Sequence, residues 1–309
     1  MHIVHGLEDF NPPWEKSALT LGVFDGMHRG HQALVSRLSK RSRKDNAARI
    51  LVTYNPHPDQ VLGKRTRTHA TELFTLNERI ALFQKFELDA VIFLPFTMEL
   101  ARMTALRYLK EILLGRLKAG RIIIGYDQCF GRGRKGDYKF LRQMSRRYSF
   151  KVEQIGVIRM GGEVISTSRI RSCLALGQVE KANRMLGHDF FVTGTVVRGF
   201  QRGRTIGFPT ANLETPETKV IPCEGVYTAR VERGAQQYRA MVNIGKKPTF
   251  GQNVLTMEAH LLDFSENLYG EQIKVNFLKR IRDEKRFGSV EELRNQLLKD
   301  LDVAKKIKL

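Results

Sequence analysis

Hydrophobic positions in the first half of the chain form short continuous runs that alternate with segments of helical spacing. We expect strands at 19–24, 50–54, 90–94, 122–124 and 151–155, and helices at 32–42, 77–85, 104–117 and 137–147. Thr104 is the expected N-cap of the third helix. This alternation predicts a parallel sheet covered by helices, with ligands bound beyond the carboxyl ends of its strands.

After Phe190 the pattern changes to a period of two. Strands are expected at 226–232, 238–244, 257–264 and 273–277, and short strands joined by Gly and Pro turns predict a small antiparallel barrel. A terminal helix should follow Ser289, with Ser289 and Glu292 as a capping box and Val290, Leu293, Leu297 and Leu301 as its apolar stripe. Gly187 is a natural helix stop, so we divide the chain into domains 1–186 and 187–309.

Length and composition exclude several classes of protein. The chain of 309 residues is long enough for two domains. No apolar run reaches the ~20 residues of a membrane span, and the N-terminus lacks a signal pattern, so no membrane partner is expected. Three widely spaced cysteines, 129, 173 and 223, favour unpaired thiols in a reducing cytoplasm.

The formal net charge of +20 is the one unusual bulk property. A basic surface can bind nucleic acid, and it also attracts small polyanions such as nucleotides. Because no stretch interleaves aromatic and basic residues and no zinc finger is present, we favour nucleotides and do not expect nucleic acid as the main partner. Weak self-association stays open.

A candidate phosphate site follows the first strand. Asp25 and Gly26 make a turn, and His28 and His31 bracket Gly30 where a helix should begin. Helix-start amides carry partial positive charge, and imidazoles can donate to phosphate oxygens. Two more segments, 55–58 and the glycine- and arginine-rich 125–136, also follow strands and should lie on the same edge. Composition alone leaves 125–136 open to being a plain surface loop.

Two further groups could handle phosphates or metal. The hydroxyls and arginines of 166–171 can cap a helix and grip phosphate, although a plain N-cap explains them as well. The stretch 194–212 is rich in glycine, which lets backbone amides approach phosphates, although ordinary turns also use it. Thr210 and Asn212 are hard oxygen donors that suit Mg²⁺. Glu258 is either a satisfied structural carboxylate or a general base.

These motifs together resemble the bacterial bifunctional riboflavin kinase/FMN adenylyltransferase (FAD synthetase) family, from near residue 15 to the end. Residues 22–31 are similar to its nucleotidyltransferase signature, 55–58 to its flavin-side loop and 166–171 to its second phosphate-binding motif. Residues 207–212 match its kinase signature closely, as does Glu258 with 262–264 and 269–270. The resemblance implies an α/β fold: a Rossmann-like nucleotidyltransferase domain with a parallel sheet, then a small antiparallel β-barrel with a terminal helix.

The resemblance also implies two reactions and the residues that serve them. Riboflavin and ATP would give FMN in the barrel, with Glu258 as base and Thr210 and Asn212 positioning Mg²⁺. FMN and ATP would give FAD and pyrophosphate in the α/β domain, where His28 and His31 stabilise charge on the triphosphate. The implied nucleotide-binding residues are Gly22, Phe24, Asp25, Gly30, Asp127, Ser166, Ser168, Arg169, Arg171, Gly194, Gly199 and Gly207, and the flavin-binding ones are Asn55, Pro56, His57 and Pro58.

One position departs from the family pattern. Similar proteins carry an aromatic residue directly after the aspartate of the 125–131 motif, whereas here Gln128 and Cys129 follow Asp127. This difference bears on how that loop packs against its nucleotide or flavin. The alternatives to the full assignment are a chain that retains only one activity, or a regulatory protein that senses flavin or nucleotide.

Overall fold

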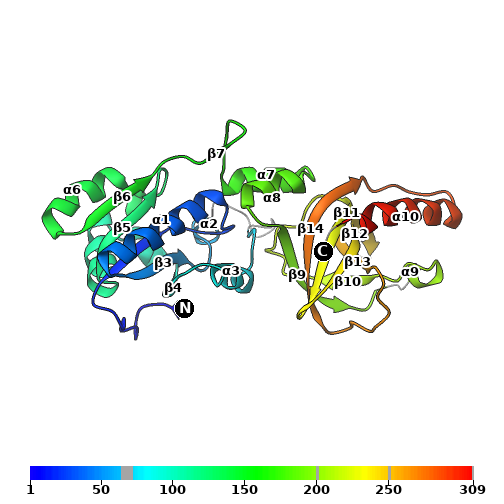
Figure 1. Cartoon of the computed structure of the whole chain (residues 1–309), viewed down its shortest axis with the longest axis horizontal. Coiled ribbons are helices and arrows are strands. Elements are labelled where there is room, and N and C mark those ends of the chain that lie inside the picture. Colours follow the sequence, from blue (N-terminus) through cyan, green and yellow to red (C-terminus); the bar gives the residue numbers. More distant parts are fainter. Residues whose placement is uncertain (64–71, 200–201, 250–251, 308–309) are drawn as a thin grey trace. The chain divides into compact units, whose positions relative to one another are not determined.

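The computed structural model describes residues 1–63, 72–199, 202–249 and 252–307. They form two compact units, Met1–Thr167 and Ser168–Leu309 (Figure 1). The first contains a parallel six-stranded sheet in the order β1-β4-β3-β2-β5-β6, and the second contains a closed antiparallel barrel in the order β10-β13-β12-β11-β14-β9. The expected fold class is therefore confirmed for both halves of the chain.

The sheet of the first unit consists of β1 (His2–His5), β2 (Ser17–Leu21), β3 (Ala48–Tyr54), β4 (Ala90–Leu94), β5 (Ala119–Gly125) and β6 (Lys151–Ile155). Its helices are α1 (Arg29–Asp45), α2 (Pro58–Val61), α3 (Leu76–Phe83), α4 (Met98–Arg102), α5 (Ala105–Arg107), the π-helix η1 (Tyr108–Arg116), the 3-10 helix η2 (Arg132–Arg134) and α6 (Tyr138–Tyr148). A short ladder pairs β7 (Arg159–Met160) with β8 (Glu163–Val164).

Both faces of this sheet are covered, which explains the continuous apolar runs of its strands. Leu19, Ile50 and Ile92 are fully buried in one cluster with side chains of η1 and α6. Helix α1 packs against β2, β3 and β5. Strand order reverses between β2 and β5, because the chain adds β3 and β4 on one side of β2 and β5 and β6 on the other. Ligands of such sheets bind in the crevice at this switch point.

Several observed elements of the first unit differ from the expected ones. Strand β2 ends at Leu21 rather than at residue 24, because Phe24 and Met27 adopt left-handed backbone with φ of 46° and 41°. Thr104 does cap a helix, but most of that helix is the π-helix η1. A Cβ at Gly115 would lie 2.9 Å from the Lys110 carbonyl, so a glycine permits this winding. Strand β1 is additional.

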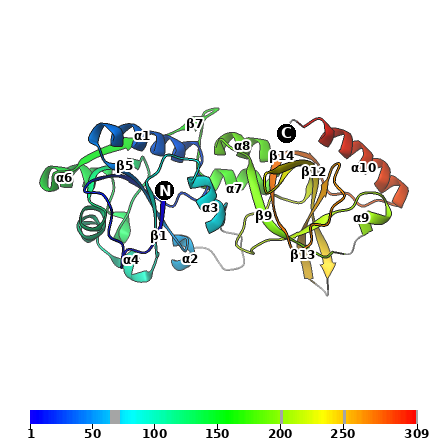
Figure 2. The ribbon, with the colours of Figure 1, turned by 60° about the horizontal axis from the view of Figure 1, so that its bottom comes forward.

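The second unit begins with α7 (Thr167–Ala175) and α8 (Val179–Leu186) and continues into the barrel. Figure 2 shows the barrel strands as a ring: β9 (Phe190–Val197), β10 (Ala211–Glu214), β11 (Gly225–Arg233), β12 (Gln236–Thr249), β13 (Gln252–Leu261) and β14 (Gln272–Arg282). The remaining helices are α9 (Arg202–Thr205) and α10 (Val290–Lys305). Strand β13 stops before the expected residue 264, because Asp263 turns the chain with a φ of 55°.

Helix α8 is attached to the barrel. Its Asn183 donates to the Phe277 carbonyl at 2.8 Å and accepts from the Phe190 amide at 2.8 Å. Gly187 ends the helix with a φ of 77°, as expected of a glycine stop. The compact units nevertheless meet at 167/168, so the domain division at 186/187 remains a prediction.

The terminal helix α10 keeps only part of its expected pattern. Ser289 accepts from the Glu292 amide at 3.2 Å, but the Glu292 carboxylate accepts from the Gly288 amide rather than from that of Ser289. Leu297 and Leu301 pack against a buried cluster that includes Phe208. Val290 is 64% exposed, so its place in the apolar stripe is wrong.

Candidate functional site

Two histidines lie stacked at the start of α1, at the carboxyl edge of the sheet. The Nδ1 atom of His28 accepts from the His31 amide at 3.3 Å and so caps the helix. The two imidazole rings lie 3.7 Å apart between centroids, with 18° between their planes. The Phe24 ring contacts His31 at 4.8 Å, so the turn after β2 supports the pair. A cap residue and the first helical turn thus present two imidazoles and the helix-start amides together.

Both histidines are electrically neutral near pH 7. Burial lowers the pKa of His28 to about 4. Burial, and after it the proximity of His28 and Arg79, lowers the pKa of His31 well below its usual value. A neutral imidazole can donate one hydrogen bond, and an anionic ligand would favour its protonated form. As neutral rings, the pair can offer N–H donors to a phosphate.

Arg79 of α3 stabilises the turn between β2 and α1, which precedes the histidine pair. Its guanidinium donates to the carbonyls of Val23 at 2.8 Å and Tyr54 at 3.2 Å, and to the Thr53 hydroxyl. Desolvation lowers the pKa of Arg79, which is 4% exposed. The ends of β2 and β3 are thereby joined by one side chain. Sequence reasoning missed this residue, since a single arginine in an amphipathic helix carries no distinguishing signal.

Asp25 has a structural contact in addition to its expected nucleotide role. Its carboxylate accepts from the Leu73 amide, with oxygen-to-nitrogen distances of 3.1 and 3.2 Å. The side chain is 2% exposed. Gly30 lies close to His28, since a Cβ there would be 3.0 Å from the His28 Cε1 atom. Both residues therefore shape the turn around the histidine pair.

The expected flavin loop follows β3. Its Asn55-Pro56 peptide bond is cis. His57 is the N-cap of α2, with its Nδ1 atom accepting from the Asp59 amide at 3.1 Å, and Pro58 is already helical. The loop expected over 55–58 is thus shorter by one residue, because proline fits the first position of a helix.

An aromatic cluster that the sequence did not reveal lies at the end of β3. The hydroxyls of Tyr54 and Tyr108 are 3.1 Å apart. Tyr54 meets Phe96 edge-on at 5.5 Å, and Tyr108 packs on Phe130 at 5.0 Å. These residues come from four separate segments, so only the folded chain assembles them.

The segment after β5 has more structure than its composition predicts. Phe130 and Gly136 exchange two backbone hydrogen bonds, of 3.0 and 2.9 Å, and the Phe130 side chain is buried. Arg134 donates to the Asp127 carbonyl at 3.0 Å. Asp127 is exposed. This segment therefore closes on itself through the Phe130–Gly136 pair, and its residues 132–135 are exposed.

The expected second phosphate motif spans the boundary between the two compact units. Ser166 precedes α7, whereas Ser168, Arg169 and Arg171 lie in its first turns and belong to the second unit. Ser168 and Arg169 are exposed. Their role toward the histidine pair stays a prediction.

In the barrel, Glu258 of β13 meets the expected metal ligands. The Thr210 hydroxyl donates to the Glu258 Oε2 atom at 3.1 Å. Asn212 of β10 stands directly opposite Glu258 in the ladder, and Asn243 of β12 stands opposite it on the other side. Residues paired in this way share one face of a sheet. The barrel thus places a carboxylate between two amides, and Asn243 is a polar member of the row that the sequence did not single out.

The expected phosphate glycines of the barrel have structural reasons of two kinds, close packing at Gly194 and Gly199 and backbone conformation at Gly207. Gly194 lies inside β9, where a Cβ would be 2.8 Å from the Glu214 carbonyl. At Gly199 a Cβ would collide with the side chain of Asn212. Gly207 has a φ of 83° in the turn before β10, a conformation that favours glycine. The backbone near Asn212 is therefore closely packed and short of side chains.

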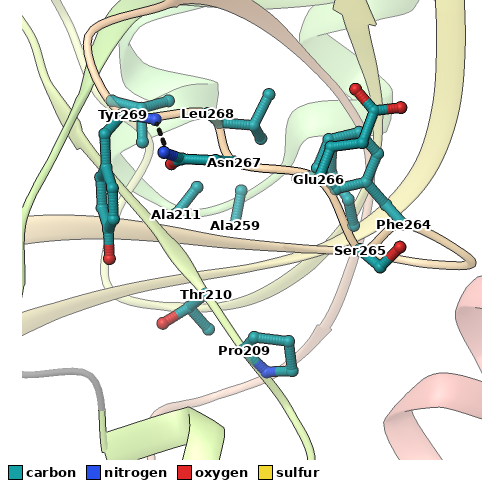
Figure 3. A pocket seen from close by; sticks show the side chains of 12 residues that line it. Pro209, Thr210, Ala211, Ala259, Phe264, Ser265, Glu266, Asn267, Leu268 and Tyr269 are labelled. Carbon is teal, nitrogen blue, oxygen red and sulfur yellow. Dashed lines mark hydrogen bonds between the residues drawn. The ribbon is translucent and has the colours of Figure 1, made fainter.

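A pocket of about 290 Å³ adjoins Thr210. Strands β9, β10 and β13 form one wall, and residues 264–269 form the other. Tyr269 and Phe264 stand on opposite sides of the pocket, with Ala211 and Ala259 between them (Figure 3). The Arg198 guanidinium lies 5.7 Å from the centre of the Tyr269 ring. The pocket has apolar walls and two aromatic rings, and the Thr210 hydroxyl at its edge contacts Glu258. This combination suits a ligand that has an aromatic ring and a phosphate group.

Among the described residues, no three His, Cys, Asp or Glu side chains gather into a metal cluster. A metal in the barrel would be held by the expected oxygen donors Thr210 and Asn212 together with the phosphate oxygens of a bound nucleotide. That set of hard oxygen donors fits Mg²⁺, which keeps several waters and is commonly held through phosphates. Over the same part of the chain, no helix combines the length and apolar character needed to cross a membrane.

Comparison with known proteins points to the same pair of activities. The family model described as FAD synthetase matches residues 11–169, and that described as Riboflavin kinase matches residues 186–308. The Bifunctional riboflavin kinase/FMN adenylyltransferase of Escherichia coli strain K12 is 34% identical, over 97% of this chain and 96% of that protein. Its namesake from Bacillus subtilis strain 168 is 32% identical, over 97% and 95%.

Similarity to solved structures extends over the whole chain, as the following structure shows. It is titled Crystal Structure of Macrolide-efflux Protein from Streptococcus pneumoniae and matches with a TM-score of 0.91 and 30% identity, covering 100% of both chains. The arrangement of a six-stranded sheet followed by a closed barrel thus occurs in a solved structure.

Proposed function

The chain belongs to the bifunctional riboflavin kinase/FMN adenylyltransferase family, and from this premise we propose how its residues divide the two reactions. The protein is an enzyme that phosphorylates riboflavin to FMN and adenylylates FMN to FAD. We assign the kinase reaction to the barrel and the adenylyl transfer to the unit Met1–Thr167.

The contact between Thr210 and Glu258 carries the kinase assignment. Glu258 accepts the proton of the terminal ribityl hydroxyl while that oxygen bonds to the γ-phosphorus of ATP. The bond from the γ-phosphorus to the β–γ bridging oxygen breaks, and ADP leaves. Phosphoryl transfer depends on positioning, which the Thr210–Glu258 contact and the register of Asn212 support, and on neutralised charge, which a bound cation would supply.

Mg²⁺ is the proposed metal of the barrel. Thr210 and Asn212 would hold it together with phosphate oxygens, and it would neutralise charge on the transferring group when bound. Gly199 and Gly207 let the backbone approach the phosphates closely. Gly194 is explained by the approach of the Glu214 carbonyl, and we do not rely on it for binding.

The pocket beside Thr210 is proposed to hold the adenine of ATP. Tyr269 and Phe264 offer ring surfaces, and Ser265 and Asn267 offer polar groups at the rim. Arg198 places positive charge against Tyr269. An adenine there would leave its phosphates near Thr210, where the carboxylate of Glu258 acts.

For adenylyl transfer we propose the edge around the histidine pair. An oxygen of the FMN phosphate bonds to the α-phosphorus of ATP, the bond from that phosphorus to the α–β bridging oxygen breaks, and pyrophosphate leaves. No side-chain nucleophile is required. His28 and His31 stabilise the charge that builds on the triphosphate.

The remaining expected binders are proposed from their motifs. Gly22, Phe24, Asp25, Gly30 and Asp127 are proposed on the nucleotide side of this edge. Ser166, Ser168, Arg169 and Arg171 are proposed as further nucleotide-binding residues on the strength of their motif alone. Asn55, Pro56, His57 and Pro58 are proposed on the flavin side, next to the aromatic cluster of Tyr54 and Tyr108. A cytoplasmic location is proposed because the substrate ATP is available there and because none of the three cysteines, all of which the structure describes, forms a disulfide.

Incubation with riboflavin, ATP and Mg²⁺, followed by chromatography of the yellow products, tests the assignment. Riboflavin should convert to FMN and then to FAD, with pyrophosphate appearing only in the second step. Accumulation of FMN without FAD would show that the chain has the kinase activity only. Binding of flavin or nucleotide without turnover would instead indicate a sensing protein.

A further inference from the structure

Gln128 occupies the switch point of the parallel sheet. It follows β5, and β5 neighbours β2 where the strand order reverses. The side chain is half-buried and folds back onto the strand ends rather than extending into solvent. It is therefore placed in the crevice where such sheets bind ligands.

One end of the amide is anchored to β5. The Oε1 atom of Gln128 accepts from the Gly125 amide at 2.7 Å. A Cβ built on Gly125 would lie 3.4 Å from the Gln128 Cδ atom, an ordinary contact distance. The carboxamide is thus held flat against the end of this strand.

The other end of the amide covers β2. A Cβ on Gly22 would lie 2.6 Å from the Gln128 Nε2 atom and 3.3 Å from the Phe24 Cε2 atom. The Phe24 ring in turn contacts His31, which stacks on His28. Gln128 and Phe24 therefore both border the space that a side chain at Gly22 would fill, and Phe24 contacts the histidine pair.

The two ends of this amide differ in their hydrogen bonding. Oε1 has the Gly125 amide, whereas no described residue accepts a hydrogen bond from Nε2. The Nε2 amino group carries two N–H donors. An uncharged, anchored donor thus faces the same edge as the neutral imidazoles.

We propose that Gln128 is a nucleotide-binding residue of the adenylylation site, and that its Nε2 atom donates to a phosphate oxygen of ATP while Oε1 stays on Gly125. This inference rests on the proposed assignment of adenylylation to the unit Met1–Thr167. Its consequence is that a glutamine at this position supplies a specific contact with substrate as well as packing between β2 and β5.

The test is Gln128→Glu in the full chain, with Cys129→Ser as the matched control from the same loop. Glutamate keeps the shape and one oxygen for the Gly125 amide, but it replaces the donor with a charged acceptor. In adenylylation of added FMN, the KM for ATP should rise about tenfold or more, with kcat and the KM for FMN within about twofold. Riboflavin phosphorylation by the same preparation should be unchanged, and Cys129→Ser should match the parent chain.

A second variant, Gln128→Met, keeps the length and removes both polar atoms. It should raise the KM for ATP by about three- to tenfold, without the added repulsion of the carboxylate. An unchanged KM for ATP in Gln128→Glu overturns the proposal, because a purely packing role predicts that result. Equal losses of kcat in Gln128→Glu and Cys129→Ser also overturn it. Absence of FAD formation by the parent chain would instead contradict the proposed function.

Discussion

The imidazole rings of His28 and His31 lie 3.7 Å apart, and the His31 amide donates to the Nδ1 atom of His28. One histidine therefore orients the other and also begins the helix that carries it. The Nδ1 lone pair of His28 is used in this contact, which leaves its Nε2 atom as the ring's donor. This arrangement presents the pair to a ligand in one tautomer of His28.

Replacing His31 with alanine should separate the two reactions. We expect His31→Ala to lower kcat/KM for FAD formation from FMN by about 100-fold, since one preorganised stabilising group is lost. Riboflavin phosphorylation should remain within twofold. His5→Ala, at the exposed edge strand β1, is the control and should leave both rates unchanged. Equal loss of both reactions in His31→Ala would argue against separate sites.

The depressed pKa of His28 predicts how stability depends on pH. In the unfolded chain this pKa is near 6.5, and in the folded chain it is about 4. Above pH 6.5 the His28 ring is neutral in both the folded and the unfolded chain, and its contribution to the free energy of unfolding is fully present. As pH falls from 6.5 toward 4, only the unfolded chain takes up the proton, so the free energy of unfolding decreases by up to about 1.4 kcal/mol per pH unit. His31 acts with the same sign.

Denaturant unfolding of the parent chain at pH 7.5 and pH 5.5 measures this dependence. His28→Asn keeps a good N-cap residue and removes the titrating ring, so its stability should vary less between the two pH values. If the free energy of unfolding falls equally in the parent chain and in the variant between pH 7.5 and pH 5.5, His28 does not titrate as described.

Removing the carboxylate of Glu258 should abolish one activity only. Glu258→Gln is expected to lower kcat for riboflavin phosphorylation by about 10²- to 10⁴-fold, because a general base is lost while the side chain keeps its size. Adenylylation of added FMN should proceed at the parent rate. Normal FMN production by this variant would show that Glu258 is not the base.

The Thr210 hydroxyl should set the metal requirement of the kinase. Thr210→Val removes the oxygen at nearly constant volume, so we expect about tenfold more Mg²⁺ for half-maximal riboflavin phosphorylation. Thr210→Ser retains the hydroxyl and should behave like the parent chain. Chelation of Mg²⁺ should stop the reaction in all three proteins. An identical Mg²⁺ titration for Val and Ser would exclude the hydroxyl as a ligand.

Gly194 should prove to be a packing residue. In Gly194→Ala the new methyl group meets the Glu214 carbonyl at 2.8 Å, so the free energy of unfolding should fall by about 1–3 kcal/mol. The KM for ATP in the kinase reaction should stay within twofold. A large rise in this KM without loss of stability would instead support direct contact with phosphate.

Two strands of the sheet match their expected bounds. β4 coincides with the expected 90–94, because it is buried along its whole length and its sequence is a continuous apolar run. β6 coincides with the expected 151–155, although it is a partly exposed edge strand. β1 gave no such signal, since it has four residues and is partly exposed. The π-helix η1 was missed because its winding depends on the backbone approach at Gly115, which residue spacing does not encode.

The candidate sites were predictable where one short motif supplies the residues. His28 and His31 belong to a single helix start, and Thr210 and Asn212 belong to a single turn and strand. Asn243 and Arg79 were missed, because each reaches its site from a distant segment through the sheet register or a buried hydrogen bond. Side chains of this kind become recognisable only when the topology is known.

Closure of the barrel has a consequence for the tolerance of this chain to insertions. β10 is paired on both sides, with Asn212 opposite Val197 of β9 and opposite Glu258 of β13. Adding or deleting one residue in this strand would reverse the faces of its side chains and bring Ala211 or Leu213 opposite the carboxylate. Such a chain would still contain every motif residue, but the shifted register of β10 would abolish its kinase activity.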